Sequence, residues 1–162
     1  IDFKAGPSIL DVGCGSAEFL NFCRQRNLEC RYNGIDIVQE MVELSNERFG
    51  NGTAMQGELL SMGSAIKYDY LIASGTFNAK LTADENLWKP FFFDNIRKMF
   101  ELCNKGIVFN CMSQYVDWRY DRLYYMSIDE ITDYCIANFS RKFIVDHSYP
   151  LYEMTIAIYK EP

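Results

Sequence analysis

The chain has 162 residues, of which 49% are hydrophobic, 15% aromatic and 23% charged. This mixture excludes a disordered, collagen-like or coiled-coil protein, and a chain of this length buries about 70% of its unfolded surface, enough for one domain with a core and a cleft. The 16 Lys and Arg and the 22 Asp and Glu give a net charge of −6. Because the basic residues occur at most as adjacent pairs, broad binding to nucleic acid or to an anionic membrane is not expected.

Cysteine and histidine usage excludes two further classes. The six cysteines contain no Cys-x-x-Cys pair, and most lie in apolar runs, where a reduced thiol behaves as a small hydrophobic group. With a single histidine and no clustered cysteines, a zinc site lacks its usual ligands, so no metal is expected. No stretch approaches the roughly 20 apolar residues of a membrane span, and the first residues do not have the layout of a signal peptide. The sequence predicts a cytoplasmic protein without disulfides.

Predicted strands and helices alternate through most of the chain. Strands are predicted over 8–13, 30–36, 53–59, 69–74 and 105–112, and helices over 16–28, 38–49, 84–103 and 127–139. The long third helix is aromatic, and either Thr82 or Asp84 is suited to cap it. Ser127, followed three residues later by Glu130, matches a capping box at the start of the fourth helix.

The end of the chain breaks this alternation. Residues 142–147 and 152–160 are two apolar, β-rich runs, and the link between them is too short for a parallel crossover. They are expected to pair as an antiparallel hairpin. The pattern therefore predicts an α/β fold, with a mostly parallel sheet, helices on both faces and one hairpin at an edge.

A glycine turn joins the first predicted strand to the first predicted helix, over residues 11–18 (DVGCGSAE). Gly13 permits a tight turn and Gly15 lets a ligand approach the backbone, because neither has a Cβ atom. Asp36 follows roughly 20 positions later, at the end of the second strand, where a carboxylate can accept both hydroxyls of a ribose. The turn and Asp36 predict a cofactor that is either a nicotinamide dinucleotide or S-adenosylmethionine.

The charges around the turn separate these two cofactors. The third glycine of a G-x-G-x-x-G pattern is absent, and Glu18 stands at its position, beside the place of a pyrophosphate. Asp11 adds a second negative charge two residues before Gly13. Two carboxylates repel a diphosphate but suit the ammonium and sulfonium groups of S-adenosylmethionine, so the charges favour the cationic cofactor.

Four segments resemble motifs of the class I S-adenosylmethionine-dependent methyltransferases. They are residues 9–17 (ILDVGCGSA), with Ala17 in place of the usual last glycine, 34–37 (GIDI), 56–59 (QGEL) and 68–75 (YDYLIASG). The predicted terminal hairpin also matches the family, so the resemblance covers nearly the whole chain. It implies a three-layer Rossmann-like sandwich with a mostly parallel seven-stranded sheet and a C-terminal antiparallel hairpin, forming a single domain over residues 1–162.

The resemblance also implies where the cofactor binds. The adenine is expected near Gly57, Glu58 and Leu59, and the ribose on Asp36 beside Ile37. Glu58 stands where aspartate is more frequent in the family. The methionine moiety is expected against residues at the ends of the first and fourth strands: Asp11, Gly13, Cys14, Gly15, Ser74 and Gly75. The family often places helices before the first strand, so we expect that an upstream segment is missing from this sequence.

Two segments are candidates for contact with the methyl acceptor. Residues 74–78 follow the fourth strand and should face the methyl group, which makes Phe77 and Asn78 candidate contacts. This segment lacks the Asn-Pro-Pro-Tyr motif used on exocyclic amines, so methylation of nucleic-acid amino groups is disfavoured. Methyl transfer can rest on positioning and exclusion of water without a dedicated base, and no catalytic residue is assigned.

The second segment, residues 113–125, is too polar for a core strand and too aromatic for an ordinary loop. As a lid, it would use Arg119 and Arg122 to clamp a carboxylate or phosphate of the substrate, with Tyr115 and Trp118 as walls. A packed connector or a dimer surface is an equally weighted alternative.

The sequence thus predicts a methyltransferase that acts on a small-molecule acceptor and releases S-adenosylhomocysteine. One alternative is a non-catalytic S-adenosylmethionine-binding or assembly subunit, because no general base is obvious. The other is an NAD(P)-dependent reductase, against which the charges at Asp11 and Glu18 argue. The acceptor, its reacting atom and the choice between monomer and homodimer stay open.

Overall fold

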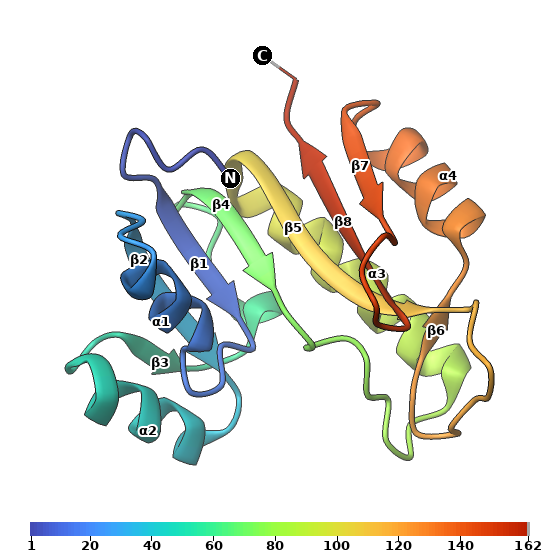
Figure 1. Cartoon of the computed structure of the whole chain (residues 1–162), viewed down its shortest axis with the longest axis horizontal. Helices are drawn as coiled ribbons and strands as arrows, with labels where there is room; N and C mark the ends of the chain where they lie inside the picture. Colours follow the sequence, from blue (N-terminus) through green and yellow to red (C-terminus); the bar gives the residue numbers. More distant parts are fainter. Residues whose placement is uncertain (162) are drawn as a thin grey trace.

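A twisted, mostly parallel sheet forms the centre of the structure, a computed structural model that describes residues 1–161 (Figure 1). The strands follow the order β3-β2-β1-β4-β5-β8-β7. They are β1 (Ser8–Val12), β2 (Arg31–Asp36), β3 (Ala54–Gln56), β4 (Tyr68–Ala73), β5 (Cys103–Ser113), β7 (Phe143–Asp146) and β8 (Glu153–Tyr159). A two-residue strand, β6 (Tyr125–Met126), pairs with the end of β5 outside this path. The predicted Rossmann-like α/β fold is confirmed, including the antiparallel pairing of β7 with β8.

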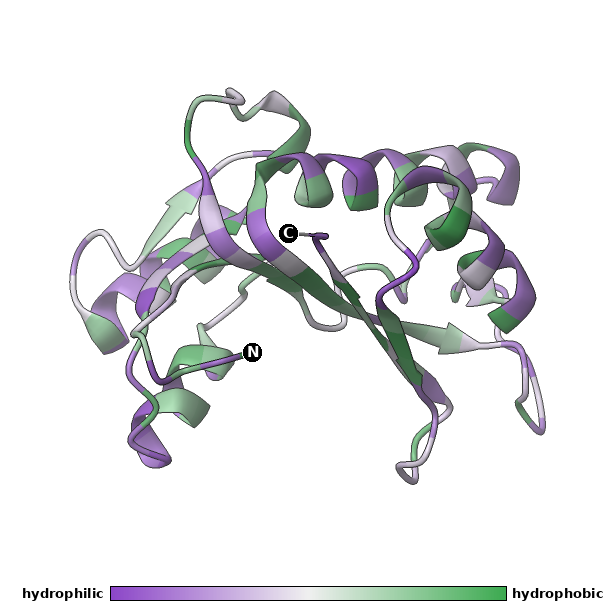
Figure 2. Cartoon of the chain, turned by 90° about the horizontal axis from the view of Figure 1, so that it is seen from above, coloured by the Kyte–Doolittle hydropathy of each residue, from purple (hydrophilic) through white to green (hydrophobic). Residues whose placement is uncertain are grey.

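Helices cover both faces of the sheet and give three layers (Figure 2). α1 (Glu18–Gln25) and α2 (Gln39–Phe49) lie on one face, and α3 (Glu85–Leu102) and α4 (Ile128–Asn138) on the other. A short 3-10 helix, η1 (Leu59–Ser61), follows β3. Because parallel crossovers are right-handed, the reversal of strand order between β1 and β4 sends the connecting helices to opposite faces. Among residues 1–161, no helix is both long and apolar enough to span a membrane.

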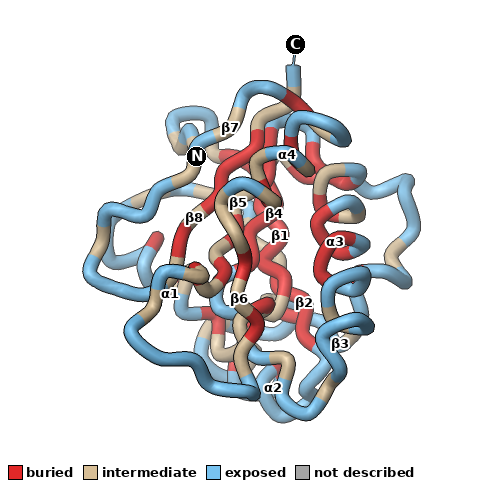
Figure 3. The backbone as a smooth tube through the Cα atoms, turned by 90° about the vertical axis from the view of Figure 1, so that its right-hand side faces the viewer, coloured by how far each residue is buried: buried red, intermediate tan, exposed pale blue. Residues whose placement is uncertain are grey.

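The main core lies between the sheet and the α3–α4 layer. Leu71 of β4, Phe109 of β5 and Phe92 of α3 are almost fully buried in it. Tyr70 and Ile72 point to the opposite face, where they pack with residues of α1 and the first residues of the chain. Figure 3 shows the buried residues along the central strands and on the side of α3 that faces them. Since both faces of β4 are covered, its sequence is nearly continuously apolar.

The parallel strands β1, β2, β4 and β5 end at the same edge of the sheet, which we call the carboxyl edge. β8 runs antiparallel to β5, so it begins at this edge: Glu153 is paired with Met112, one residue before the end of β5. Open α/β sheets bind ligands at the carboxyl edge, next to the reversal of strand order. In this structure the reversal lies between β1 and β4.

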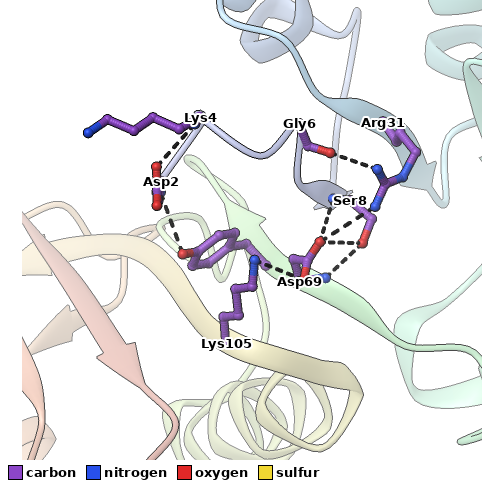
Figure 4. Close-up of polar contacts among 8 residues, drawn as sticks. Asp2, Lys4, Gly6, Ser8, Arg31, Asp69 and Lys105 are labelled. Carbon is purple, nitrogen blue, oxygen red and sulfur yellow. Dashed lines mark hydrogen bonds and ion pairs between the residues drawn. The ribbon is translucent and has the colours of Figure 1, made fainter.

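The opposite edge is closed by a polar network around Asp69 (Figure 4). The Asp69 carboxylate accepts hydrogen bonds from the Ser8 amide at 2.9 Å and the Ser8 hydroxyl at 3.2 Å. Lys105 and Arg31 lie 3.3 and 3.7 Å from the same carboxylate. The Ser8 amide, together with Lys105 and the Ser8 hydroxyl, keeps the pKa of Asp69 below its usual value, against the opposing effect of burial. The network ties β1, β2, β4 and β5 together at their first residues and leaves the carboxyl edge free.

Two local predictions were wrong. The third strand is shorter than predicted and ends at Gln56: the Gly57 amide still donates to the Asp36 carbonyl of β2 at 3.0 Å, and the chain then turns into η1. Ser127 precedes α4 as expected, but its side chain makes no capping hydrogen bond, and Glu130 instead forms an ion pair with Lys89 of α3. The predicted cap of α3 is confirmed for Asp84, whose carboxylate accepts the Asn86 amide at 2.7 Å.

Candidate functional site

A cavity of about 510 Å³ opens at the carboxyl edge. Its walls are the end of β1 with Gly13, residues 35–38, residues 57–60, parts of the loop after β4 and the first turns of α3. This volume is ordinary for a small-molecule site. The cavity therefore lies where the reversal of strand order leaves a crevice, and it contains six of the predicted cofactor residues: Gly13, Asp36, Ile37, Gly57, Glu58 and Leu59.

Asp36, the last residue of β2, connects the glycine turn after β1 to the start of α2 on one side of this cavity. Its side chain is buried, and its two carboxylate oxygens accept the Gly15 amide at 2.8 Å and the Val38 amide at 2.9 Å. Each oxygen retains a further lone pair for a ligand donor. Two backbone amides thus fix the carboxylate at the cavity wall, in an orientation suited to a diol.

The glycine turn uses the left-handed conformation repeatedly. Gly13, Gly15 and Ala17 have φ values of 67°, 51° and 59°. A Cβ atom on Gly13 would lie 2.6 Å from Oγ1 of Thr76, and that hydroxyl donates to the Val12 carbonyl at 2.8 Å. No atom lies within 4 Å of the corresponding position on Gly15. Gly13 is therefore required for the loop after β4 to close on β1, whereas Gly15 leaves the space above the turn open.

Asp11 is buried behind the turn and does not line the cavity. Its carboxylate accepts the Tyr32 hydroxyl at 2.8 Å. Burial raises the pKa of Asp11 to about 7, the Tyr32 hydrogen bond opposes this rise, and the nearby Asp36 charge adds to it. Asp11 is thus partly protonated near neutral pH, and a nearby cation would favour its charged form.

Cys14 is a packed thiol within the turn. It is 7% exposed, and a Cβ atom on Gly34 would lie 2.5 Å from its Sγ atom. Burial raises the pKa of Cys14 to about 12, with smaller contributions from Asp11 and Asp36. Cys14 therefore fits a small residue of the turn and not a nucleophile.

The ionisable residues that line the cavity are acidic. Among the described residues of its wall they are Asp36 and Glu58, and no lysine or arginine is present there. Apolar side chains such as Ile37, which is 67% exposed, form much of the rest. An apolar slot with carboxylates and no cation suits an adenosine carrying a sulfonium and is unfavourable for a pyrophosphate.

The other predicted residues near the methyl group lie at the end of β4. Ser74 and Gly75 are exposed, and the Gly75 amide donates to Oδ1 of Asn110 at 2.6 Å. Phe77 reaches the cavity wall but belongs to the core, with its ring 5.3 Å from that of Phe92. Asn78 is half-buried on the same loop.

The residues predicted as a substrate lid do not line the cavity. Trp118 packs against Tyr152 of the β7–β8 turn with ring centroids 6.1 Å apart, and Tyr115 lies 6.2 Å from the ring of His147. The Arg119 guanidinium stacks on Tyr125 at 5.1 Å.

This segment is also joined to the loop after β4, since the Leu81 amide donates to the Arg122 carbonyl at 3.0 Å. Tyr115, Trp118, Arg119 and Arg122 are exposed, and the first three contact aromatic rings of neighbouring segments, as in a connector. Contact of these four residues with substrate stays a prediction.

Sequence reasoning missed several residues of the site. Trp88 and Phe91 of the aromatic helix α3 were given no site role, but both line the cavity. Residues three apart on a helix share a face, and the sequence cannot distinguish a cavity wall from a core. Tyr32 and the pair formed by Asn110 and Glu153 gave no sequence signal, because their partners come from other strands. Thr76 lies in the predicted segment 74–78, but its hydrogen bond to the Val12 carbonyl was not predicted.

Comparisons with known proteins identify the family of this chain. Residues 3–135 match a family model described as a methyltransferase domain. A protein of Mycobacterium tuberculosis named as a methyltransferase is 32% identical over 155 residues, which cover 94% of this chain and 93% of the relative.

Two solved structures share the fold. The first is magnesium protoporphyrin IX methyltransferase from Synechocystis with S-adenosylhomocysteine bound, which has a TM-score of 0.71 at 18% sequence identity. The aligned part covers 96% of this chain and 75% of the Synechocystis chain. The second is an amino pentose methyltransferase from Micromonospora echinaspora with S-adenosylmethionine bound, which has a TM-score of 0.72 at 11% sequence identity. The aligned part covers 96% of this chain and 84% of the Micromonospora chain. These matches exclude the reductase alternative and favour an enzyme over an assembly subunit: the chain belongs to the class I S-adenosylmethionine-dependent methyltransferases.

Proposed function

We propose that this enzyme transfers the methyl group of S-adenosylmethionine to a small-molecule acceptor, using the cavity at the carboxyl edge as its cofactor site. The observation that carries the assignment of the cavity is its wall, which is mainly apolar, has Asp36 and Glu58 as its ionisable residues and Thr76 and Asn95 as neutral polar ones, and has no basic residue among the described residues that line it. When bound, the cofactor supplies a methyl group that its sulfonium makes electrophilic. The chain supplies orientation and exclusion of water.

Each part of the cofactor has suitable partners in this arrangement. Asp36 is proposed to accept the ribose hydroxyls on the lone pairs that Gly15 and Val38 leave free. The adenine is proposed to lie between Ile37 and Leu59, near the Gly57 and Glu58 backbone. The open space above Gly15 suits the methionine carboxylate and ammonium, with Ser74 and Gly75 on its other side.

A small acceptor is supported by charge and by the related structures. The net charge of −6 and the scattered basic residues do not suit a nucleic-acid substrate. Two related structures are named for methyltransferases of a porphyrin and of an amino pentose, both small molecules. The exposed region beyond Ser74 and Gly75 lies outside the cofactor cavity and is open to such an acceptor.

The cofactor assignment is tested by calorimetric titration with S-adenosylhomocysteine and, separately, with NADH. We expect micromolar binding of S-adenosylhomocysteine only, weakened at least about tenfold in Asp36→Ala, because the ribose loses two charge-assisted hydrogen bonds. The exposed Asp133→Asn variant on α4 is the control. Unchanged affinity in Asp36→Ala would contradict the ribose assignment.

The acceptor class is tested with methyl-tritiated S-adenosylmethionine. A cell extract is divided into small-molecule, protein and nucleic-acid fractions, and each is incubated with the enzyme. We expect label in the small-molecule fraction. Label that accumulates instead in protein or nucleic acid would overturn the proposal of a small acceptor and leave the cofactor assignment intact.

A further inference from the structure

A half-buried polar network crosses the carboxyl edge next to the cofactor cavity. Glu153, the first residue of β8, accepts a hydrogen bond from Nδ2 of Asn78 on Oε1 at 2.9 Å, and Nδ2 of Asn110 donates to Oε2. Oδ1 of Asn110 in turn accepts the Gly75 amide at 2.6 Å. One carboxylate therefore links β8, β5 and the loop that follows β4.

This network fixes the orientation of the Asn78 side chain. An ionised carboxylate only accepts hydrogen bonds, so Asn78 must turn its NH₂ group toward Glu153 and its Oδ1 atom away. That Oδ1 atom is buried and has no hydrogen-bond partner. A buried acceptor without a partner costs about 1–3 kcal/mol, so a protein retains one where a ligand or another group satisfies it.

The charge of Glu153 has no counterion within the described part of the chain. Its two partners are neutral amides, and no lysine, arginine or histidine lies within 4.0 Å of its oxygens. The residue is half-buried, so its charge is less screened than on the open surface. The half-buried carboxylate and the buried Asn78 oxygen are both hydrogen-bond acceptors, a combination that attracts hydrogen-bond donors and repels anions.

The position of this surface relative to the cofactor follows from Gly75. The Gly75 amide is held by Asn110, and the Asn78 backbone carbonyl accepts the Tyr124 amide at 2.9 Å. The loop is thus fixed at both ends. In the proposed function, the methionine end of the cofactor lies against Gly75, so the network stands beside the methyl group and on the side away from the adenine.

From this geometry we infer that Asn78 and Glu153 form the subsite that receives the reacting group of the methyl acceptor. This inference rests on the proposed function and adds the acceptor class: an amine or hydroxyl that donates a hydrogen bond to Asn78 Oδ1 and Glu153, and not a carboxylate or phosphate. The acceptor's N–H or O–H hydrogen points at the Glu153 carboxylate, which leaves a lone pair of the same atom free for the methyl group. As that lone pair forms the bond to the methyl carbon, the carbon–sulfur bond of the cofactor breaks and the acceptor's proton passes to Glu153. Asn110 acts as a positioning residue, since it contacts Glu153 and Gly75.

The test compares two cofactor analogues and needs no known acceptor. S-adenosylhomocysteine has nothing at the place of the transferred methyl group, whereas sinefungin carries an amino group there, which is cationic at neutral pH. Calorimetry gives the dissociation constant of each. In the wild-type protein we expect sinefungin to bind more tightly than S-adenosylhomocysteine, because its ammonium meets the two acceptor oxygens.

Glu153→Gln and Asn78→Ala should each reduce this sinefungin preference about tenfold while leaving S-adenosylhomocysteine affinity within about twofold of wild type. Glu47→Gln, an exposed carboxylate of α2, is the matched control and should keep the preference. Thermal unfolding verifies that each variant is folded, and if Glu153→Gln is not, Asn78→Ala carries the test.

Three results separate the possibilities. An unchanged preference in the folded variants overturns the subsite. An equal loss of affinity for both analogues overturns it as well, because the network then only shapes the cofactor cavity. A wild-type protein that binds neither analogue contradicts the proposed cofactor site itself.

Discussion

The backbone amide of Gly15 donates a hydrogen bond of 2.8 Å to the carboxylate of Asp36. The side chain proposed to bind the ribose therefore also holds the glycine turn, and its second oxygen holds the Val38 amide at the start of α2. Cofactor affinity and local stability are thus coupled through one carboxylate.

This coupling predicts a double effect of Asp36→Asn. The amide retains one acceptor oxygen but places an NH₂ group opposite either the Gly15 or the Val38 amide, both of which are donors. We expect the free energy of unfolding in urea to fall by about 1–3 kcal/mol. Affinity for S-adenosylhomocysteine should fall with it, and Asp133→Asn should change neither. Wild-type stability of Asp36→Asn would show that the two amides find other acceptors.

Gly13 should not tolerate a side chain. In Gly13→Ala, the new Cβ atom would lie 2.6 Å from Thr76 Oγ1, and φ at this position is 67°. We expect a loss of about 1–3 kcal/mol in the free energy of unfolding. Gly63→Ala is the matched control, because nothing lies within 4 Å of its new Cβ atom. Combining Gly13→Ala with Thr76→Ala should restore the part of the unfolding free energy that is lost through the clash. If nothing is restored, the whole loss comes from the positive φ angle at residue 13.

Asp11 should make stability depend on pH in the cofactor-free protein. Burial raises its pKa from 3.8 to about 7, so folding favours the protonated form. The protonated Asp11 carboxyl group therefore contributes its full stabilisation below about pH 4, and this stabilisation is lost as the pH rises toward about 7. Above that pH no further change is expected from Asp11, and the whole change in the free energy of unfolding is at most roughly 4 kcal/mol.

Asp11→Asn isolates this contribution, since the amide does not titrate. The unfolding free energy of wild type relative to Asp11→Asn should fall between about pH 4 and 7, measured by urea denaturation at several pH values. Tyr32→Phe removes the hydrogen bond that opposes the rise in the Asp11 pKa, so it should move the upper limit of this window to higher pH. A constant difference between wild type and Asp11→Asn would contradict the burial of a protonated Asp11.

The sequence was sufficient to predict the parallel strands and their helices, because the short apolar runs alternate with amphipathic segments that have clear ends. Gly13 and Asp36 were predictable as a pair, since a strand that ends in glycine and an acidic residue after the next strand lie at one edge in any such sheet. The hydrogen bond from the Gly15 amide to Asp36 was not predictable, because it depends on the register of Asp11 with Gly34 in β1 and β2.

The proposed acceptor subsite was predictable only for Asn78, for the same physical reason. Glu153 reaches the carboxyl edge because β8 runs antiparallel and pairs Glu153 with Met112, a register that no local pattern contains. In contrast, the aromatic and basic residues of the segment 113–125 gave a strong local signal. Their packing partners on the β7–β8 turn, such as Tyr152, lie far away in sequence.

The two tryptophans give a direct test of which side chains enclose the bound cofactor. Trp88 lines the cavity, and its indole nitrogen is buried without a hydrogen-bond partner. Trp118 is 58% exposed, outside the cavity. Indole fluorescence depends on local polarity and contacts, so S-adenosylhomocysteine should change the emission of Trp88 and leave that of Trp118 unchanged.

Trp118→Phe should therefore retain the fluorescence change on titration with S-adenosylhomocysteine, and Trp88→Phe should abolish it. Calorimetry on both variants verifies that the ligand still binds. The reverse result, with the change lost in Trp118→Phe and kept in Trp88→Phe, would mean that residues 113–125 move from their contact with Tyr152 toward the bound ligand. That segment would then act as the lid predicted from its composition, and not as the packed connector described by its contacts.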